Sequence, residues 1–150
     1  MLNVGDRAPA FEAHTDSGDT VSLDGLLAEG PFVLYFYPAD FTPVCTKEAC
    51  MFRDAHPRLV QAGVRVYGVS PQGTSSHAAF REKHDLNFPL LADPDKQIVK
   101  AYGATLPLGL GVRRVSYLIG RDGVIADRAV ADLRVGPHEA FVDRVLARGG

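Results

Sequence analysis

The sequence is poor in cysteine. Its 150 residues include two, Cys45 and Cys50, which are too few for the disulfide scaffold of a small secreted domain. Since 46% of the residues are hydrophobic, the chain can bury a core without such cross-links, and its length suits one domain spanning residues 1–150. In a reducing compartment both thiols stay reduced, so we expect any pairing between them to be transient and catalytic rather than structural.

Surplus charge and long apolar runs are also missing. The chain has 16 Lys and Arg against 18 Asp and Glu, for a formal net charge of −2, and its basic residues are scattered. This pattern argues against a nucleic-acid partner. No run approaches the roughly 18 apolar residues that a membrane span needs, and the first residues lack the basic and apolar segments of a signal peptide. We therefore expect a soluble, cytoplasmic protein with no membrane contact.

Motifs for bound nucleotides and metals do not occur. The sequence has no GxGxxG or Walker pattern, which argues against a nucleotide cofactor. It has no HExxH pattern, and its histidines show no spacing to one another or to the cysteines that indicates a metal site. We expect no cofactor and no metal, and we expect the histidines at the surface or at helix caps. The five are His14, His56, His77, His84 and His138.

What the chain does have is short apolar runs that alternate with helical patterns. Phe32–Tyr37 is continuously apolar or aromatic and is ended by Pro38, which predicts a central strand buried on both faces of a sheet. Val64–Val69 predicts a second strand, and Asn87–Leu91 predicts a short third one. Phe11–Leu23 indicates a hairpin, because polar residues and a glycine separate two short extended pieces.

Helices are predicted between these strands. One runs over Pro43–Ala62, with a break expected near His56-Pro57, because proline removes a donor and clashes with the preceding turn. Ser75–His84 is a candidate helix. Asp93-Pro94 predicts an N-cap followed by a first-turn proline, which together begin another helix.

The last third of the chain predicts a second hairpin and a final helix. Val115–Ile119 and Val124–Val130 flank Asp122-Gly123, a pair that tolerates the positive φ of tight turns. Gly136-Pro137 begins a helix with one apolar stripe. Strands mixed with covering helices make an α/β layered domain.

The first cysteine lies where a thiolate is favoured. Thr42 precedes a proline, so its backbone is steered towards the extended conformation that an N-cap residue needs, and Pro43 suits the first helical position. Cys45 is then the third residue of the helix, beside unpaired N–H groups that carry about half a positive charge. The alternative is that Cys45 is a small buried hydrophobic residue and Thr42 only a cap.

The second cysteine is five residues further on. In an ideal helix this spacing gives a rise of about 7.5 Å and a Cα separation of about 8.6 Å, beyond the roughly 7 Å limit for a disulfide. Pairing of Cys45 with Cys50 therefore requires the first helical turns to unwind. The alternative is that Cys50 is a core residue on the inner face of the helix.

The segment PADFTPVC, residues 38–45, resembles the PxxxTxxC active-site motif of peroxiredoxins. Cys50 stands where the Q, or bacterioferritin-comigratory, subfamily has a resolving cysteine. Three other stretches carry the resemblance along most of the chain: Gly5–Phe11, Asn87–Asp93 and Arg114–Ile119. The resemblance implies a thioredoxin-like fold with peroxiredoxin additions, in which helices flank a central mixed β-sheet.

The resemblance also implies roles for individual residues. Cys45 is similar to the peroxidatic nucleophile, Thr42 to the hydroxyl that orients peroxide, and Pro38 to the residue that shields the site from water. Arg114 matches the family arginine that lies beside the thiolate, where its permanent charge favours the ionised form. Glu48 occupies the position of an acid that orients this arginine, and an ordinary acid on the helix surface is the alternative.

The activity implied is that of a thiol peroxidase. Cys45 attacks hydrogen peroxide or an alkyl hydroperoxide and becomes a sulfenic acid, Cys50 forms a disulfide with it, and thioredoxin reduces that disulfide. No metal, haem or flavin takes part, and relatives include monomers and homodimers. One alternative is a one-cysteine peroxidase resolved by an external thiol. The other is a non-catalytic redox sensor that uses the thiols to change its surface.

Three positions near the motif qualify the resemblance. Arg113 lies on the opposite side of its strand from Arg114 and is the weaker candidate for the site. Val44 replaces a glycine that many Q-type members have before the cysteine. Residues 105–112 form a shorter and more apolar loop than in some relatives. The last two differences leave the peroxide preference and the ease of local unfolding open.

Overall fold

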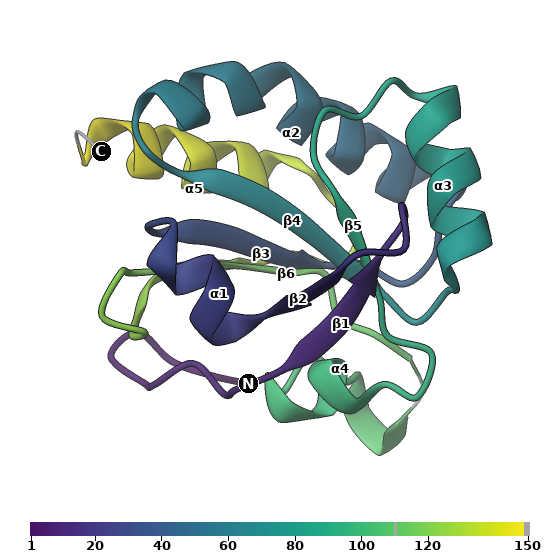
Figure 1. The fold of residues 1–150 in the computed structure, drawn as a ribbon, viewed down its shortest axis with the longest axis horizontal. Coiled ribbons are helices and arrows are strands. Elements are labelled where there is room, and N and C mark those ends of the chain that lie inside the picture. The colour runs from purple at the N-terminus through teal and green to yellow at the C-terminus, as the bar shows by residue number, and fades with distance from the viewer. Residues whose placement is uncertain (110, 149–150) are drawn as a thin grey trace.

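The computed structural model describes residues 1–109 and 111–148 (Figure 1). Seven strands form one mixed sheet in the order β2-β1-β5-β4-β3-β6-β7. The strands are β1 (Glu12–Thr15), β2 (Thr20–Ser22), β3 (Phe32–Phe36), β4 (Arg65–Ser70), β5 (Leu90–Ala92), β6 (Val115–Ile119) and β7 (Ile125–Val130). The helices are α1 (Leu23–Ala28), α2 (Pro43–Gln61), α3 (Thr74–Lys83), α4 (Gln97–Ala101) and α5 (Gly136–Ala147), with a short 3-10 turn at Pro107–Gly109.

Strand β3 lies inside the sheet, as its apolar run predicted. It pairs in parallel with β4 and antiparallel with β6, and all five of its residues are buried. Because successive side chains point to opposite faces, Phe32, Leu34 and Phe36 enter one core while Val33 and Tyr35 enter the other. The strand that precedes the cysteine motif is therefore fixed from both sides.

The two cores correspond to two helical layers (Figure 1). Helices α2, α3 and α5 cover one face of the sheet, and α2 and α5 lie side by side on it. Helices α1 and α4 contribute buried residues to the core on the other face. Both predicted hairpins are confirmed, since β1 pairs antiparallel with β2 and β6 pairs antiparallel with β7. The predicted α/β class with a central mixed sheet is also confirmed.

The predicted break at His56-Pro57 is wrong, because α2 continues through Pro57 to Gln61. A proline at this position leaves the carbonyl of Arg53, four residues earlier, without its helical donor. The side-chain amide of Asn87 donates to that carbonyl at 3.0 Å. Burial of Leu59 after the proline holds the last turn of the helix against the core. A contact from a distant segment thus offsets a local helix-breaking signal.

Two other boundaries differ from prediction. The third strand begins at Leu90 rather than Asn87, which fits the missing N–H of Pro89. Helix α4 begins at Gln97 rather than at Asp93-Pro94, because these two residues form a turn in which Lys96 N donates to Asp93 O at 2.9 Å. The Asp93 carboxylate still serves the helix, since it accepts from the backbone N–H of Val99 at 2.9 Å.

The histidine prediction is partly wrong. His77 and His138 are fully buried rather than at the surface, and both ring nitrogens of each have polar partners. His14 is exposed, while His56 and His84 are half-buried. Among the helices of the described residues, none combines the length and the apolar character needed to cross a membrane.

Candidate active site

The cysteine motif forms the start of α2, directly after strand β3. Thr42 has the extended backbone of an N-cap residue, at φ −82° and ψ 151°, and its carbonyl accepts from Thr46 N at 2.8 Å. These features confirm the predicted helix start, with Pro43 first and Cys45 third. Within the described chain the Thr42 hydroxyl makes no capping bond, and it turns back to donate to Ala39 O at 3.4 Å.

Cys45 is buried beneath this turn, with 1% of its surface exposed. Arg114 Nη1 donates to its Sγ at 3.1 Å, although the two residues are far apart in the sequence. A guanidinium at this distance donates a charge-assisted hydrogen bond to the sulfur. The structure thus brings the predicted thiol and the predicted arginine into direct contact.

Arg114 is held in place from several directions. It lies immediately before β6, and its Nε donates to Asp132 O at 3.2 Å while its backbone N donates to Asp132 Oδ1 at 3.0 Å. Its Nη1 also donates to Glu48 Oε1 at 3.0 Å. Burial lowers the pKa of Arg114, but the charges of Glu48 and Cys45 outweigh burial and raise it above its ordinary value. The guanidinium is therefore a permanent and preorganised cation at the thiol.

Glu48 is fully buried, so the alternative of an ordinary surface acid is excluded. Its Oε1 accepts from Arg114, while its Oε2 has no hydrogen-bond partner among the described residues. Burial raises the pKa of Glu48 to about 8, against the opposing effect of the Arg114 charge. Glu48 therefore keeps its proton to a higher pH than an exposed acid does.

His138 is a further member of this buried network that the sequence prediction missed. Its Nδ1 lies 3.6 Å from Glu48 Oε2 and 2.8 Å from the hydroxyl of Ser116, and its Nε2 lies 3.1 Å from Ala131 O. A carbonyl accepts only, so Nε2 carries the proton, and burial lowers the pKa of His138 and keeps the ring neutral. The sequence does contain a signal for the burial of His138, because its spacing to Phe141 and Val145 places it on the same buried face of the helix.

A pocket opens over the motif and forms the mouth of the site. It is lined by Pro38, Thr42, Pro43, Val44, Leu106, Val112, Arg114, Asp132 and Leu133. Most of these side chains are apolar, and Arg114, whose guanidinium contacts Cys45, is also among the lining residues. Leu106 and Val112 come from the predicted apolar loop, of which Leu110 lies outside the described residues. A small polar group with an apolar tail fits this mouth.

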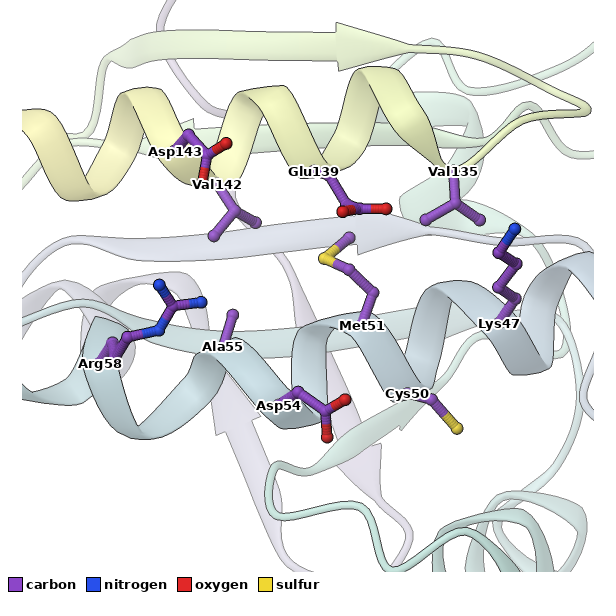
Figure 2. Close-up of a pocket in the computed structure, with 10 residues that line it drawn as sticks. All are labelled: Lys47, Cys50, Met51, Asp54, Ala55, Arg58, Val135, Glu139, Val142 and Asp143. Atoms are coloured by element: carbon purple, nitrogen blue, oxygen red, sulfur yellow. The ribbon is translucent and has the colours of Figure 1, made fainter.

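Cys50 is half-buried and is a free thiol, like Cys45. Figure 2 shows the groove between α2 and α5, in which Met51 of α2 points towards Glu139 of α5. The Cys50 side chain lies at the edge of this groove and points away from α5. Because Cys45 and Cys50 stand on one continuous helix, the spacing argument holds, and their pairing requires the first turns of α2 to unwind.

Arg113 stays outside the site, as the strand alternation predicted. Its Nη2 forms an ion pair with Asp132 Oδ2 at 3.1 Å, and 31% of its side chain is exposed. Asp132 therefore contacts both neighbouring arginines. No group of three His, Cys, Asp or Glu residues that suits a metal ion occurs within residues 1–109 and 111–148.

Comparison with known proteins agrees with this geometry. The profile of the AhpC/TSA family matches residues 4–128. The chain belongs to the AhpC/TSA family. A relative named putative peroxiredoxin bcp, from Coxiella burnetii, is 41% identical over 131 residues, which cover 83% of this chain and 86% of the relative. Peroxiredoxin Bcp of Bacillus subtilis is 38% identical over 129 residues, or 81% of each chain.

Two solved structures show the same AhpC/TSA architecture. Peroxidoxin BcpB from Mycobacterium tuberculosis superposes with a TM-score of 0.90 at 30% identity, over 99% of this chain and 98% of that one. The bacterioferritin comigratory protein of Xanthomonas campestris, studied for its alkyl peroxide reduction activity, has a TM-score of 0.85 at 27% identity, over 93% and 92% of the two chains. The predicted thioredoxin-like peroxiredoxin fold is thereby confirmed.

Family membership gives the class of reaction. The relatives are named peroxiredoxins, which are thiol-dependent peroxidases, and this AhpC/TSA member is a thiol-dependent peroxidase. It uses a peroxide as oxidant and a thiol as reductant. The two cysteines of the chain suit the two thiol roles of such a cycle.

Proposed function

We propose that Cys45 is the peroxidatic cysteine of this peroxidase. The observation that carries the proposal is the 3.1 Å contact between Arg114 Nη1 and Cys45 Sγ at the start of a helix. The thiolate attacks one peroxide oxygen, so that an S–O bond forms as the O–O bond breaks. Sulfur loses two electrons and becomes a sulfenic acid, and the other oxygen takes a proton and leaves as water or an alcohol.

The residues around the thiol assist this displacement. Arg114 and the first-turn N–H groups of α2 stabilise the charge that develops on the peroxide oxygens. The Thr42 hydroxyl, which lines the mouth, orients the peroxide, and Pro38 shields the reacting atoms from water. Glu48 holds the guanidinium through its Oε1 contact of 3.0 Å.

Cys50 completes the cycle as the resolving cysteine. Its thiol condenses with the Cys45 sulfenic acid after the first turns of α2 unwind, and water leaves as the disulfide forms. Thioredoxin then reduces the disulfide by dithiol exchange. We place this cycle in the cytoplasm, where thiols are kept reduced, and assign it to one domain spanning residues 1–150.

The apolar mouth supports a substrate range that includes alkyl hydroperoxides as well as hydrogen peroxide. Val44, Leu106 and Leu133 surround the opening with hydrocarbon, which suits the tail of an organic peroxide. The alkyl peroxide reduction of the Xanthomonas campestris relative supports the same range. Val44 and Leu106 belong to the two places where the sequence departs from its relatives.

A stoichiometric oxidation tests the assignment. Reduced protein is mixed with about one equivalent of hydrogen peroxide, free thiols are followed in time, and the intact mass is taken without reductant. We expect both thiols to disappear with the loss of two hydrogens, and we expect Cys45→Ser to abolish turnover. Substantial peroxidase activity in Cys45→Ser would contradict the assignment.

The Cys50→Ser variant separates the resolving role from its alternatives. We expect a stalled sulfenic acid on Cys45 and no turnover with thioredoxin. Full turnover with a small external thiol, equal to that of the unmodified chain, would favour a one-cysteine cycle. Oxidation without recycling by any thiol would favour a redox sensor.

A further inference from the structure

The loop that precedes the cysteine motif is tied to a helix that the peroxide chemistry does not use. Residues 38–42 connect β3 to α2 and carry both Pro38 and Thr42. Between them lies Asp40, which is 5% exposed although it belongs to a connecting loop. Most of its partners come from α3 and the segment before it.

Asp40 accepts from three side chains at once. Tyr37 donates its hydroxyl to Oδ1 at 2.7 Å, and Ser76 donates its hydroxyl to Oδ2 at 2.7 Å. His77 Nδ1 lies 2.7 Å from the same Oδ2. The backbone N–H of Asp40 donates to the side-chain carbonyl of Gln72. Three of these four partners lie on α3 or just before it, so α3 holds both the backbone and the side chain of Asp40.

The contact between Asp40 and His77 is buried and lies between an acidic and a basic side chain. The other ring nitrogen of His77, Nε2, lies 3.1 Å from Leu91 O, which accepts only. Both ring nitrogens of His77 therefore face oxygen atoms, one from the loop and one from β5. Burial raises the pKa of Asp40, but hydrogen bonds from His77, Tyr37 and Ser76 outweigh burial and lower it. Both side chains of the pair are 0% exposed.

The residue after Asp40 has a strained backbone. Phe41 has a φ of +66°, in the left-handed region that a residue with a bulky side chain rarely adopts. Its ring packs edge-on against Phe80 of α3, with the ring centroids 5.2 Å apart. Such strain persists only where the surrounding structure holds it, and here α3 contacts both Asp40 and the Phe41 ring.

We propose that the contact between Asp40 and His77 is a latch that holds the start of α2 folded and sets how fast Cys50 reaches the Cys45 sulfenic acid. This inference rests on the resolving role of Cys50 in the proposed function. While the latch is closed, loop 38–42 and the first turn of α2 stay in place, and the sulfenic acid remains in the peroxide site. When the latch opens, the strain at Phe41 is relieved, and the turn that separates the two sulfurs unwinds. His77 is thus a positioning residue that acts through Asp40.

The latch decides between two fates of the sulfenic acid. A second peroxide oxidises it to the sulfinic acid if it stays in the folded site, and Cys50 converts it to a disulfide if the helix start opens. A tighter latch therefore favours overoxidation, and a weaker latch favours the disulfide. A purely structural contact would change the melting temperature without changing this partition.

The test compares His77→Gln and Ser76→Ala with the unmodified chain. Each reduced protein is mixed with increasing hydrogen peroxide and quenched in time, and mass spectrometry counts Cys45 as sulfinic acid or as disulfide. We expect disulfide formation about tenfold faster in His77→Gln, which removes the imidazole that joins Asp40 to Leu91 O, and a few-fold faster in Ser76→Ala, which removes one hydrogen bond. The sulfinic fraction falls accordingly. Ser75→Ala is the matched control, because Ser75 is exposed on the same turn of α3.

The outcomes separate the latch from the function on which it rests. A disulfide in the unmodified chain that forms at the same rate in His77→Gln and Ser76→Ala would overturn the latch alone. If His77→Gln fails to fold, Ser76→Ala decides, since it keeps His77 against Asp40 and loses only the hydrogen bond from the Ser76 hydroxyl to Asp40. An unmodified chain that never forms the Cys45–Cys50 disulfide would overturn the resolving step and the latch together.

Discussion

At the scale of single residues, one guanidinium nitrogen serves two partners. Arg114 Nη1 lies 3.1 Å from Cys45 Sγ and 3.0 Å from Glu48 Oε1. A protonated Glu48 leaves the positive charge to the sulfur, whereas an ionised Glu48 competes for it. The protonation state of Glu48 therefore changes how much of the Arg114 charge acts on the Cys45 sulfur, although Glu48 reaches that sulfur only through Arg114.

The first prediction concerns the geometry of that arginine. We expect Arg114→Lys to lower kcat/KM for hydrogen peroxide by about 100-fold, because a compact ammonium replaces a planar fork that contacts Cys45, Glu48 and Asp132 together. Rapid-mixing oxidation of Cys45 measures the effect. Arg113→Lys is the matched control at the neighbouring position. Equal rates in the two variants would contradict the special role of Arg114.

The second prediction concerns pH and Glu48. Its pKa in the folded protein is about 8, above the ordinary value of an acid, so the folded state keeps a proton that the unfolded state releases. The stability tied to this proton is complete below the ordinary pKa and is lost as the pH rises through about 8. In the unmodified chain, we expect the free energy of unfolding to fall by on the order of a few kcal/mol as the pH rises, because of Glu48. We expect this fall to be absent in Glu48→Gln.

Urea denaturation of both proteins from about pH 5 to about pH 9 measures this difference, and all other titrating groups cancel in the comparison. Parallel pH profiles for Glu48→Gln and the unmodified chain would show that Glu48 does not titrate in this range.

At the scale of secondary-structure elements, the sequence predicted correctly those features that depend on interactions between neighbouring residues. The Thr42-Pro43 start of α2 and the run Phe32–Tyr37 were predicted because capping and burial are encoded within a few residues. The passage of α2 through Pro57 was missed because its compensation, the Asn87 amide on the Arg53 carbonyl, comes from a distant segment. Contacts of this long-range kind also explain why the burial of His77 and His138 was not predicted.

The third prediction tests that compensation with a double-mutant cycle. We expect Asn87→Ala to destabilise the protein by about 1 kcal/mol, because it leaves the Arg53 carbonyl without a donor. The same change in a Pro57→Ala background should cost less, since the restored N–H of residue 57 supplies the helical bond. Thermal denaturation of the four proteins measures the coupling. Equal costs of Asn87→Ala in both backgrounds would contradict the explanation.

At the scale of the whole molecule, the start of α2 belongs to the core. Cys45, Ala49 and Phe52 are buried against the face that α5 also covers. Unwinding the first turns to join Cys45 to Cys50 must therefore remove apolar surface from the core. The alternation of strands and helices and the resemblance to peroxiredoxins predicted the layers correctly. The contacts that fix this helix start were not predicted, because they come from side chains of α3, of α5 and of the segment before β6.

The fourth prediction follows from that cost. We expect the oxidised protein to melt at a temperature lower by about 5 °C or more than the reduced protein, although cross-links usually stabilise. The disulfide closes a loop of only about six residues, which constrains the unfolded chain little, and it disrupts a folded helix. Calorimetry of the two forms measures the shift. An oxidised form that melts at the same or a higher temperature would contradict the unwinding.

The hydrogen bond from Tyr37 to Asp40 has a photophysical consequence. The chain contains no tryptophan, so its five tyrosines alone produce its intrinsic emission. A phenol that donates to a carboxylate at 2.7 Å loses its excited-state proton readily and emits weakly. Release of Asp40 would make Tyr37 brighter, and a Tyr37→Phe chain would lack this change. Tyr37 thus serves as an unlabelled fluorescent reporter in the same core cluster as Cys45, readable during turnover in a cuvette.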